Sequence, residues 1–357
     1  MQTAHDHQTT GARTRSTGRV EASKPTRNAN LGAARLAKND EFYTLKHDIE
    51  NEVKHYRQHF KGKVVFCNCD DPEQSNFWIF FHQKFDDYGL KRLVATHYAR
   101  DGKGAGVLMC HDESRDEEGQ PIIETKPLQG DGDFRSKECV DLLETSDIVC
   151  TNPPFSLFRE FITLITEKNK QFLVIGSQNA VTTKDVFPLI KSNRLWLGVS
   201  KPTGFRTPSG EMKTVGTYWY TNLEHKRRKE EVDLVRSYEG NREGYPSYDN
   251  FDAIECGKVA NIPMDFDGVM GVPTTFLENY NPSQFEIVSI TMRWSPLRNK
   301  TYEREPGTAP GEAHTLNGGA TIKVKTAPVG KTPHRVGDST YVKMFPRLLI
   351  RRKTSAQ

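Results

Sequence analysis

The feature that most constrains this chain is a proline-rich loop between a predicted strand and a predicted helix. Residues 146–150, Ser-Asp-Ile-Val-Cys, form a short apolar run that is typical of a buried strand. After the loop, apolar residues at 157, 158, 161, 162, 164 and 165 fall on one helical face, with Ser156 as the expected N-cap. The loop itself is Thr-Asn-Pro-Pro-Phe, residues 151–155. In an open α/β sheet, ligands bind at such carboxyl ends of strands.

The loop has the chemistry needed to hold an amino group. Pro153 and Pro154 fix two φ angles and remove two backbone donors, so the loop is rigid and rich in acceptors. The side-chain carbonyl of Asn152 and the backbone carbonyl of Pro153 can accept both hydrogens of an exocyclic amino group. This would direct the nitrogen lone pair at an electrophile, while Phe155 offers a flat face to a base. A proline-stiffened turn with a helix-capping Asn is the alternative, but the strand–loop–helix order favours a site.

Asn-Pro-Pro-Phe after a strand resembles the catalytic motif of amino-group methyltransferases that use S-adenosylmethionine. In that group the motif occurs mostly with adenine N6 as the target. It also occurs in RNA guanine and protein glutamine methyltransferases, so it indicates the reaction better than the substrate. The resemblance implies S-adenosylmethionine as cofactor and Asn152, Pro153, Pro154 and Phe155 as catalytic residues.

Composition excludes several other classes of protein. The 357 residues carry a net charge of +4, which is compatible with a polyanionic partner but does not demonstrate one. The mean hydropathy is −0.68, and no apolar run approaches the length of a membrane span. The N-terminus lacks the hydrophobic core of a signal peptide, so we expect a cytoplasmic protein without a membrane partner. The six cysteines show no zinc spacing, and we expect no metal.

Residues 1–37 are rich in Thr, Ala, Arg and Asn and almost lack large apolar side chains. This composition predicts a disordered basic tail. A solvated tail is the simpler interpretation, and a basic arm that contacts phosphates is the functional one.

Three further segments resemble the cofactor-binding motifs of the same methyltransferases. Residues 40–44, Asp-Glu-Phe-Tyr-Thr, precede a predicted helix over 46–60, and the family places this segment over the methionine end of the cofactor. A predicted strand over 63–68 leads to two aspartates, and carboxylates there can accept from ribose hydroxyls or an ammonium group. The residues assigned to the cofactor by these two segments are Phe42, Tyr43, Thr44, Asp70, Asp71 and Pro72.

The third segment is Gly-Asp-Gly-Asp-Phe at 130–134, before a predicted helix over 136–145. It resembles the family motif that binds the adenine of the cofactor, with Asp133 accepting from the adenine amino group and Phe134 stacking or offering its backbone N–H. A Gly/Asp turn is the alternative. One departure from the wider family is Glu-Gln-Ser-Asn at 73–76, where glycines usually allow close backbone approach to the cofactor.

Strands and helices alternate from 63 to 200, which predicts a mostly parallel, doubly wound α/β sheet. Residues 101–127 are predicted to form a surface excursion or a hairpin. The family places an aromatic side chain in a later loop, on the face of the target base opposite Phe155, and Phe205 is the candidate. Trp219 and Tyr220 in the β-like segment 217–221 are alternatives, and ordinary core packing would explain all three as well.

From residue 224 the pattern changes to basic and Gly/Pro-punctuated segments. Residues 225–229 are His-Lys-Arg-Arg-Lys, and residues 293–353 carry 13 Lys and Arg against four Asp and Glu. Each charge run alone is explained by a solvated face. Together, beside a catalytic half, they predict a region that docks on DNA.

The segments at 40–44, 67–72, 130–136, 151–160 and 268–273 together resemble the EcoRI-type adenine-specific DNA methyltransferases, over about residues 38–290. That subfamily shares the missing glycines. The resemblance implies a Rossmann-like doubly wound sheet, an S-adenosylmethionine-binding catalytic domain over 38–223 and a DNA target-recognition region over 224–357. It also implies a monomer of a bacterial modification system, or an orphan or phage-borne relative. A cognate restriction endonuclease encoded nearby would form no stable complex with it.

The predicted function is therefore transfer of a methyl group to N6 of an adenine flipped out of double-stranded DNA. One alternative is methylation of another amino group: cytosine N4, RNA guanine or protein glutamine. The other is a catalytically dead DNA-binding module, against which the intact Asn-Pro-Pro-Phe argues.

Overall fold

The computed structural model describes residues 43–69, 71, 74–99, 105–207, 209–303, 314–326 and 328–353. The predicted tail over 1–37 lies outside these residues, as do Phe42, Asp70 and Pro72. Within the part of the chain that is described, no helix has both the length and the apolar character needed to cross a membrane.

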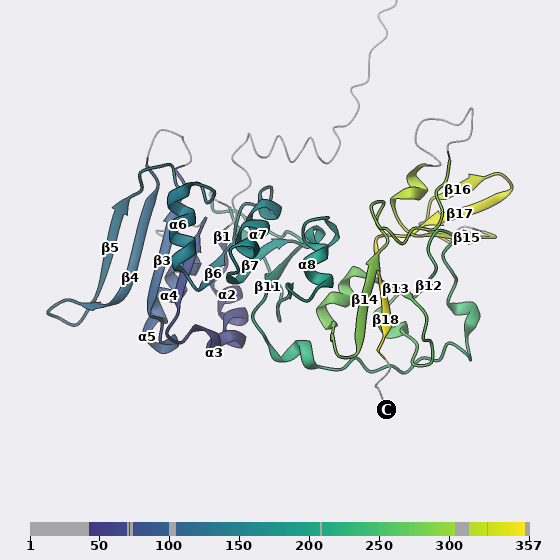
Figure 1. Cartoon of the computed structure of the whole chain (residues 1–357), viewed down its shortest axis with the longest axis horizontal. Coiled ribbons are helices and arrows are strands. Elements are labelled where there is room, and N and C mark those ends of the chain that lie inside the picture. Colours follow the sequence, from purple (N-terminus) through teal and green to yellow (C-terminus); the bar gives the residue numbers. More distant parts are fainter. Residues whose placement is uncertain are drawn as a thin grey trace, which may run out of the picture. The chain divides into compact units, whose positions relative to one another are not determined.

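The largest sheet has eight strands in the order β5-β4-β3-β2-β6-β7-β11-β8 (Figure 1). They are β2 (Val64–Asn68), β3 (Arg92–His97), β4 (Val107–Arg115), β5 (Pro121–Pro127), β6 (Ile148–Thr151), β7 (Gln171–Ser177), β8 (Trp196–Leu197) and β11 (Thr217–Thr221). The four central strands β3, β2, β6 and β7 are parallel to one another. This is the mixed α/β architecture that the sequence predicted.

The prediction of a mostly parallel sheet is wrong at both flanks. Strands β4 and β5 form the hairpin predicted as one option for 101–127, and both of their pairings are antiparallel. The connection between them, residues 116–120, is too short for the crossover that a parallel pair requires. On the other side β11 runs antiparallel to both β7 and β8.

Helices cover both faces of this sheet because its central strands are apolar on both sides. Phe66, Val149 and Val174 pack with one set of helices, and the alternating residues Val65 and Ile175 pack with the other. The first set comprises α6 (Lys137–Thr145), α7 (Phe158–Glu167), η2 (Gln178–Thr182) and α8 (Phe187–Lys191). The second comprises α2 (Lys46–Val53), η1 (Lys54–Tyr56), α3 (Arg57–Phe60), α4 (Asn76–Gln83) and α5 (Phe85–Tyr88).

The predicted cap of α7 is wrong. The helix begins at Phe158 with Leu157 as N-cap residue, and Ser156 lies in the turn before it. The reason is the loop itself: Leu157 N donates to Pro154 O at 2.9 Å, so a tight turn uses Ser156 before the helix starts. Ser136, by contrast, caps α6 by accepting from Cys139 N.

The rest of the chain adds smaller sheets and short 3₁₀ turns. A three-stranded sheet contains β1 (Tyr43–Thr44), β9 (Phe205–Arg206) and β10 (Met212–Lys213). A four-stranded sheet contains β12 (Ile254–Glu255), β13 (Met270–Pro273), β18 (Arg347–Arg352) and β14 (Phe285–Ile290), and another has β15 (Thr321–Val324), β17 (Ser339–Lys343) and β16 (Pro333–Val336). The 3₁₀ turns are η3 (Lys226–Lys229), η4 (Arg242–Gly244), η5 (Val259–Asn261), η6 (Thr274–Asn279) and η7 (His314–Gly318).

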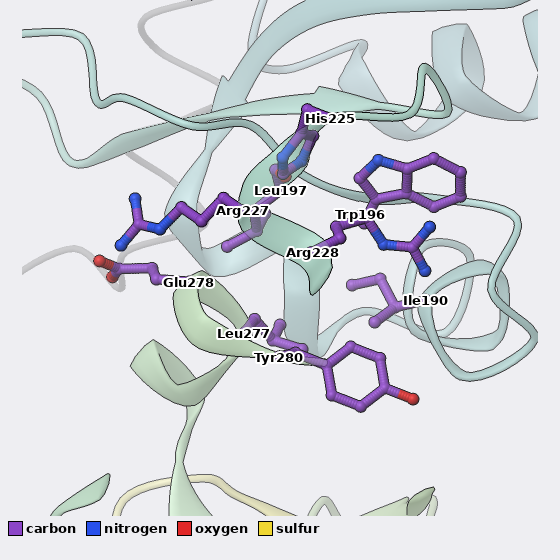
Figure 2. Close-up of a pocket in the computed structure, with 9 residues that line it drawn as sticks. All are labelled: Ile190, Trp196, Leu197, His225, Arg227, Arg228, Leu277, Glu278 and Tyr280. Carbon is purple, nitrogen blue, oxygen red and sulfur yellow. The ribbon is translucent and has the colours of Figure 1, made fainter. Parts of the chain in front are cut away.

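Figure 2 shows where β8 meets the segment that follows β11 and the η6 turn. The guanidinium of Arg228 lies 3.6 Å from the centre of the Trp196 ring, and His225 Nε2 is 3.0 Å from the carbonyl of Leu197. Leu277 and Tyr280 close the other side (Figure 2). The cavity left between these side chains has a volume of about 10 Å³, which is room for one water molecule at most. This junction is therefore packing and not a ligand site.

His225 predicts a pH dependence of stability. Burial lowers its pKa from 6.5 to about 4, and His111, also buried, has its pKa lowered to about 4 by burial and by His82. Between pH 6.5 and pH 4 the unfolded chain gains protons that the folded chain does not, so the free energy of unfolding falls as the pH falls. Each histidine contributes about 3 kcal/mol at most to this loss.

Chemical denaturation of the His225→Gln variant between pH 4 and pH 8 tests this. We expect the loss of stability on acidification to be smaller than that of the unsubstituted protein, with His111 among the groups that supply the remainder. An unchanged pH profile would contradict a neutral, buried His225.

Candidate functional site

The carboxyl ends of β3, β2 and β6 bring polar residues to one edge of the sheet. Asn68, the last residue of β2, pairs in register with Thr96 of β3. Thr151, the last residue of β6, donates its hydroxyl to the backbone carbonyl of Asn68. The side chains of Asn68 and Thr96 are each 1 % exposed. The loop that contains Asn152 therefore starts directly beside the end of β2, the strand that leads to the two aspartates predicted to bind the cofactor.

The Asn-Pro-Pro-Phe loop leaves this edge as a rigid turn. Asn152 is 8 % exposed, and the neighbouring Pro153 is also buried. Phe155 is half-buried against the core on the α2 and α4 face. Its ring packs edge-on against Phe205, with ring centres 5.9 Å apart and an interplanar angle of 82°.

Phe205, the residue predicted to lie on the opposite face of the target base, has no exposed area. It lies in β9, where it pairs with Thr44 of β1. The side chain of Asn76 donates to the carbonyl of Thr44 at 2.6 Å and fixes β1 to the start of α4. Tyr43 and Thr44, predicted to face the cofactor, are thus joined through one strand to the aromatic that supports Phe155.

Two buried carboxylates of α2 hold the segment that leads into β9. Glu52 has no exposed area and accepts from Val199 N at 2.8 Å, from Ser200 N at 2.6 Å, and from the hydroxyls of Ser200 and Tyr56. Asp48 accepts from Thr203 N at 2.9 Å. Since β9 follows within two residues of Thr203, these bonds set the position of Phe205.

The loop of residues 130–133 is closed against the end of β3. Ala99 N donates to Asp131 O at 2.7 Å, and Gly106 N donates to Gly130 O at 2.8 Å. Gly132 has a φ of +84°, and a Cβ atom there would lie 2.3 Å from the carbonyl oxygen of His97. Only glycine fits this approach. The loop therefore presents the next residue, Asp133, at the same edge as Asn68.

Asp133 is held by a bidentate ion pair. Arg135 Nε donates to Oδ1 at 2.9 Å and Nη2 donates to Oδ2 at 2.6 Å, while Nη1 donates to Glu160 of α7 at 2.9 Å. The side-chain hydrogen bonds from Arg135 lower the pKa of Asp133, so its carboxylate stays ionised. Since Arg135 N also donates to Oδ1, a lone pair on Oδ2 remains for a further donor. The Phe134 ring packs in the core against Phe161, which leaves its backbone for contacts at the edge.

The turn after β2 is made without the glycines that the wider family has there. Cys69 adopts a left-handed conformation with a φ of +67°, which is rare for a residue with a Cβ atom. The backbone carbonyl of Asp71 then accepts from Gln74 N and Ser75 N, and Ser75 caps α4. The chain thus turns at Cys69 and enters α4 through a serine cap.

Sequence reasoning missed several residues of this edge. Asn68 Oδ1 is a buried polar atom for which the described residues supply no hydrogen-bond partner, and Thr96 is buried beside it. The available signal was a polar residue at the end of an otherwise apolar strand. Glu52 and Arg135 gave no signal, because a helical glutamate and an exposed arginine are ordinary in a sequence.

The surface has two hollows near the predicted cofactor segments. One, of about 760 Å³, is lined by residues that include Tyr43, Asn76 and Arg206. The other, of about 530 Å³, is lined by residues that include Arg135 and Glu160. Each adjoins one of the predicted cofactor segments. Among the residues placed by the structure, no group of three or more His, Cys, Asp or Glu is arranged to hold a metal ion.

A family model described as "Adenine-specific methyltransferase EcoRI" matches residues 30–353. The chain belongs to this family. It is similar to the type II methyltransferase M.EcoRI of Escherichia coli, with 44 % identity over 290 residues that cover 73 % of this chain and 89 % of that protein. It is also similar to M.MpnI of Mycoplasma pneumoniae, with 42 % identity over 71 % of this chain and 83 % of the relative. A third relative, M.MgeORF184P of Mycoplasma genitalium, is 39 % identical over 72 % of this chain and 85 % of its own.

In this EcoRI-type methyltransferase we expect Glu52→Gln to lower the free energy of unfolding by about 3 kcal/mol, because an amide presents an N–H₂ group to buried donors. Urea denaturation measures the change. Glu50→Gln is the control: Glu50 is exposed and 3.8 Å from Lys46, and its loss should change stability by about 0.5 kcal/mol or less. Equal effects of the two substitutions on the free energy of unfolding would show that the hydrogen bonds of Glu52 do not hold the segment between β8 and β9.

Proposed function

We propose that the protein is a site-specific DNA methyltransferase that transfers a methyl group from S-adenosylmethionine to N6 of an adenine flipped out of double-stranded DNA. The observation that carries this proposal is the Asn-Pro-Pro-Phe loop, which leaves β6 beside the end of β2 in a member of an adenine-specific methyltransferase family. The eight-stranded sheet is proposed to be a Rossmann-like, doubly wound methyltransferase sheet. Residues 38–223 would form the catalytic domain and residues 224–357 the target-recognition region.

The residues at the edge fit S-adenosylmethionine. The ionised Asp133 suits the adenine amino group, Asp71 suits the ribose or the ammonium, and Tyr43 and Thr44 pair with β9, whose Phe205 packs on Phe155. The buried atom Asn68 Oδ1 is a polar group that a bound nucleoside would satisfy. Phe42, Asp70 and Pro72 complete the proposed set. When bound, the cofactor supplies a methyl group activated on a sulfonium.

The chain's own contribution to the reaction is orientation. Asn152 and Pro153 would accept the two hydrogens of the adenine amino group, which aims the nitrogen lone pair, and Pro154 keeps the loop rigid. Phe155 would stack on the flipped base, with Phe205 either on the opposite face or, as its burial favours, supporting Phe155 from below. No general base is required if the proton leaves after transfer.

The enzyme is proposed to act on double-stranded DNA as a cytoplasmic monomer. The type II names of the relatives support a place in a modification system, in which a cognate restriction endonuclease would act on its own.

Transfer from labelled S-adenosylmethionine to unmethylated DNA, followed by digestion to nucleosides and mass spectrometry, tests the proposed reaction. We expect N6-methyladenine. N4-methylcytosine would overturn the base assignment while keeping the mechanism, and transfer only to RNA or protein would overturn the DNA substrate.

Asn152→Ala tests the catalytic loop. We expect methyl transfer to fall by at least about a hundredfold, because one of the two acceptors for the amino group is lost, while calorimetric affinity for S-adenosylhomocysteine stays within about twofold. Asn51→Ala, on the exposed side of α2, is the matched control and should change neither quantity. A parallel loss of cofactor affinity and activity would contradict the assigned role.

Asp133→Ala tests the adenine-binding assignment. We expect the affinity for S-adenosylhomocysteine to fall at least about tenfold, since a charge-assisted hydrogen bond is lost. The transfer rate at saturating cofactor should change little. Asp141→Ala removes an exposed aspartate of α6 that pairs with Lys137 and should leave the affinity unchanged. Unaltered affinity in Asp133→Ala would exclude this carboxylate as a ligand.

A further inference from the structure

The three-stranded sheet β15-β17-β16, drawn in yellow in Figure 1, has one face on the protein core. Ile322 of β15 pairs in register with Val342 of β17, and both belong to the buried cluster around Phe251 and Leu349. Because side chains alternate along a strand, the neighbouring residues point to the opposite face.

That opposite face is basic. Lys323 is directly opposite Tyr341, which is in turn opposite His334, and Lys343 is opposite Thr321. Both lysines are exposed. Tyr341, on this face, is buried under Tyr302 and Leu316, whereas Lys323 and Lys343 on either side of it stay exposed.

The positive charge of this sheet is not neutralised within the protein. The strands and their connections carry Lys323, Lys325, Lys331, Arg335 and Lys343, with Asp338 as the one acidic residue among those that are described. In the described part of the chain, no ion pair involves any of these five cations. On β18, by contrast, Arg347 pairs with Glu255 and Arg351 with Glu286.

Large apolar side chains stand exposed among these cations. Phe345, just after β17, is 73 % exposed, and Val329, in the connection between β15 and β16, is fully exposed. Lys331 Nζ lies 4.7 Å from the centre of the Phe345 ring. An exposed aromatic ring beside unpaired lysines is a costly arrangement for a surface that contacts only water, and it is the combination with which proteins grip nucleic acid.

We propose that a basic surface docks on the DNA duplex, formed by Lys323 and Lys343 of the sheet and by Lys331 beside the Phe345 ring. The lysines bind backbone phosphates, and Phe345 packs against a base step or a sugar beside them. The docking rests on the proposed function, since it takes DNA as the substrate. Phosphate contacts fix the position of the duplex without reading its sequence, so this face anchors DNA while the target base is presented elsewhere.

The salt dependence of DNA binding tests the proposal with the full chain. The affinity for an unmethylated duplex is measured from 50 to 300 mM KCl for the unsubstituted protein, the triple variant Lys323→Gln/Lys331→Gln/Lys343→Gln, and the control Lys61→Gln/Lys91→Gln/Lys191→Gln. The control lysines are exposed and lie at the opposite end of the large sheet's strands or on α8. Each lost phosphate contact lowers the slope of log affinity against log salt by about 0.9.

We expect the slope of the triple variant to fall by about 2 to 3 and its affinity at 150 mM KCl to fall at least tenfold. The control triple variant should behave as the unsubstituted protein does. Phe345→Ala should weaken binding several-fold with the slope unchanged, and Phe345→Trp should restore it. Affinity for S-adenosylhomocysteine should be the same in every variant, which verifies that the proteins are folded.

An unchanged slope in the triple variant, with N6-methyladenine still formed by the unsubstituted protein, would overturn the docking face and leave the proposed function standing. A slope that falls equally in both triple variants would also overturn it, because the weaker binding would then come from the lower net charge of the protein and not from the loss of this surface. If the unsubstituted protein neither bound nor methylated DNA, the proposed function and the docking face would fail together.

Discussion

The arrangement of the candidate site depends on the buried carboxylate of Glu52. Three of its hydrogen bonds fasten the segment after β8 to α2, the fourth comes from Tyr56, and Asp48 fastens the same segment one helical turn earlier. This segment leads into β9, which pairs with β1 and carries Phe205 under the Phe155 ring. A buried carboxylate is stable only when donors surround it, so the segment has little freedom to move. The proposed cofactor segment and the proposed base-stacking ring therefore share one support.

A second link joins the other end of the site. Arg135 ties Asp133 to Glu160 of α7, and α7 begins directly after the Asn-Pro-Pro-Phe loop. The hydroxyl of Thr151 ties the start of that loop to the end of β2. The catalytic loop is thus connected on both sides to elements proposed to bind the cofactor. In a reaction that requires little beyond alignment of a methyl group and an amino nitrogen, such rigidity is the main contribution a protein can make.

The sequence predicted what short stretches determine. The order of strand, loop and helix around residues 151–155 is local, and so is the turn at Gly132, which only glycine can occupy. The parallel centre of the sheet followed from alternating strands and helices. The β4–β5 hairpin is local and was one of two options predicted for 101–127. The antiparallel pairing of β11, the contact of Phe205 with Phe155 and the bonds of Glu52 could not be predicted, because each joins residues far apart in the chain and none has a distinctive residue pattern. Ser156 was misassigned because two prolines ahead of it made a turn where a helix cap was expected.

The central claim is that the cofactor segments and the Asn-Pro-Pro-Phe loop form one site at the carboxyl edge of β3, β2 and β6. A crystal structure of the full chain with S-adenosylhomocysteine tests it most directly. The account predicts a ligand whose adenine contacts Asp133, whose amino-acid end lies near Tyr43 and Thr44, and whose sulfur faces Asn152. A ligand bound away from this edge, or with its sulfur turned from Asn152, would contradict the account.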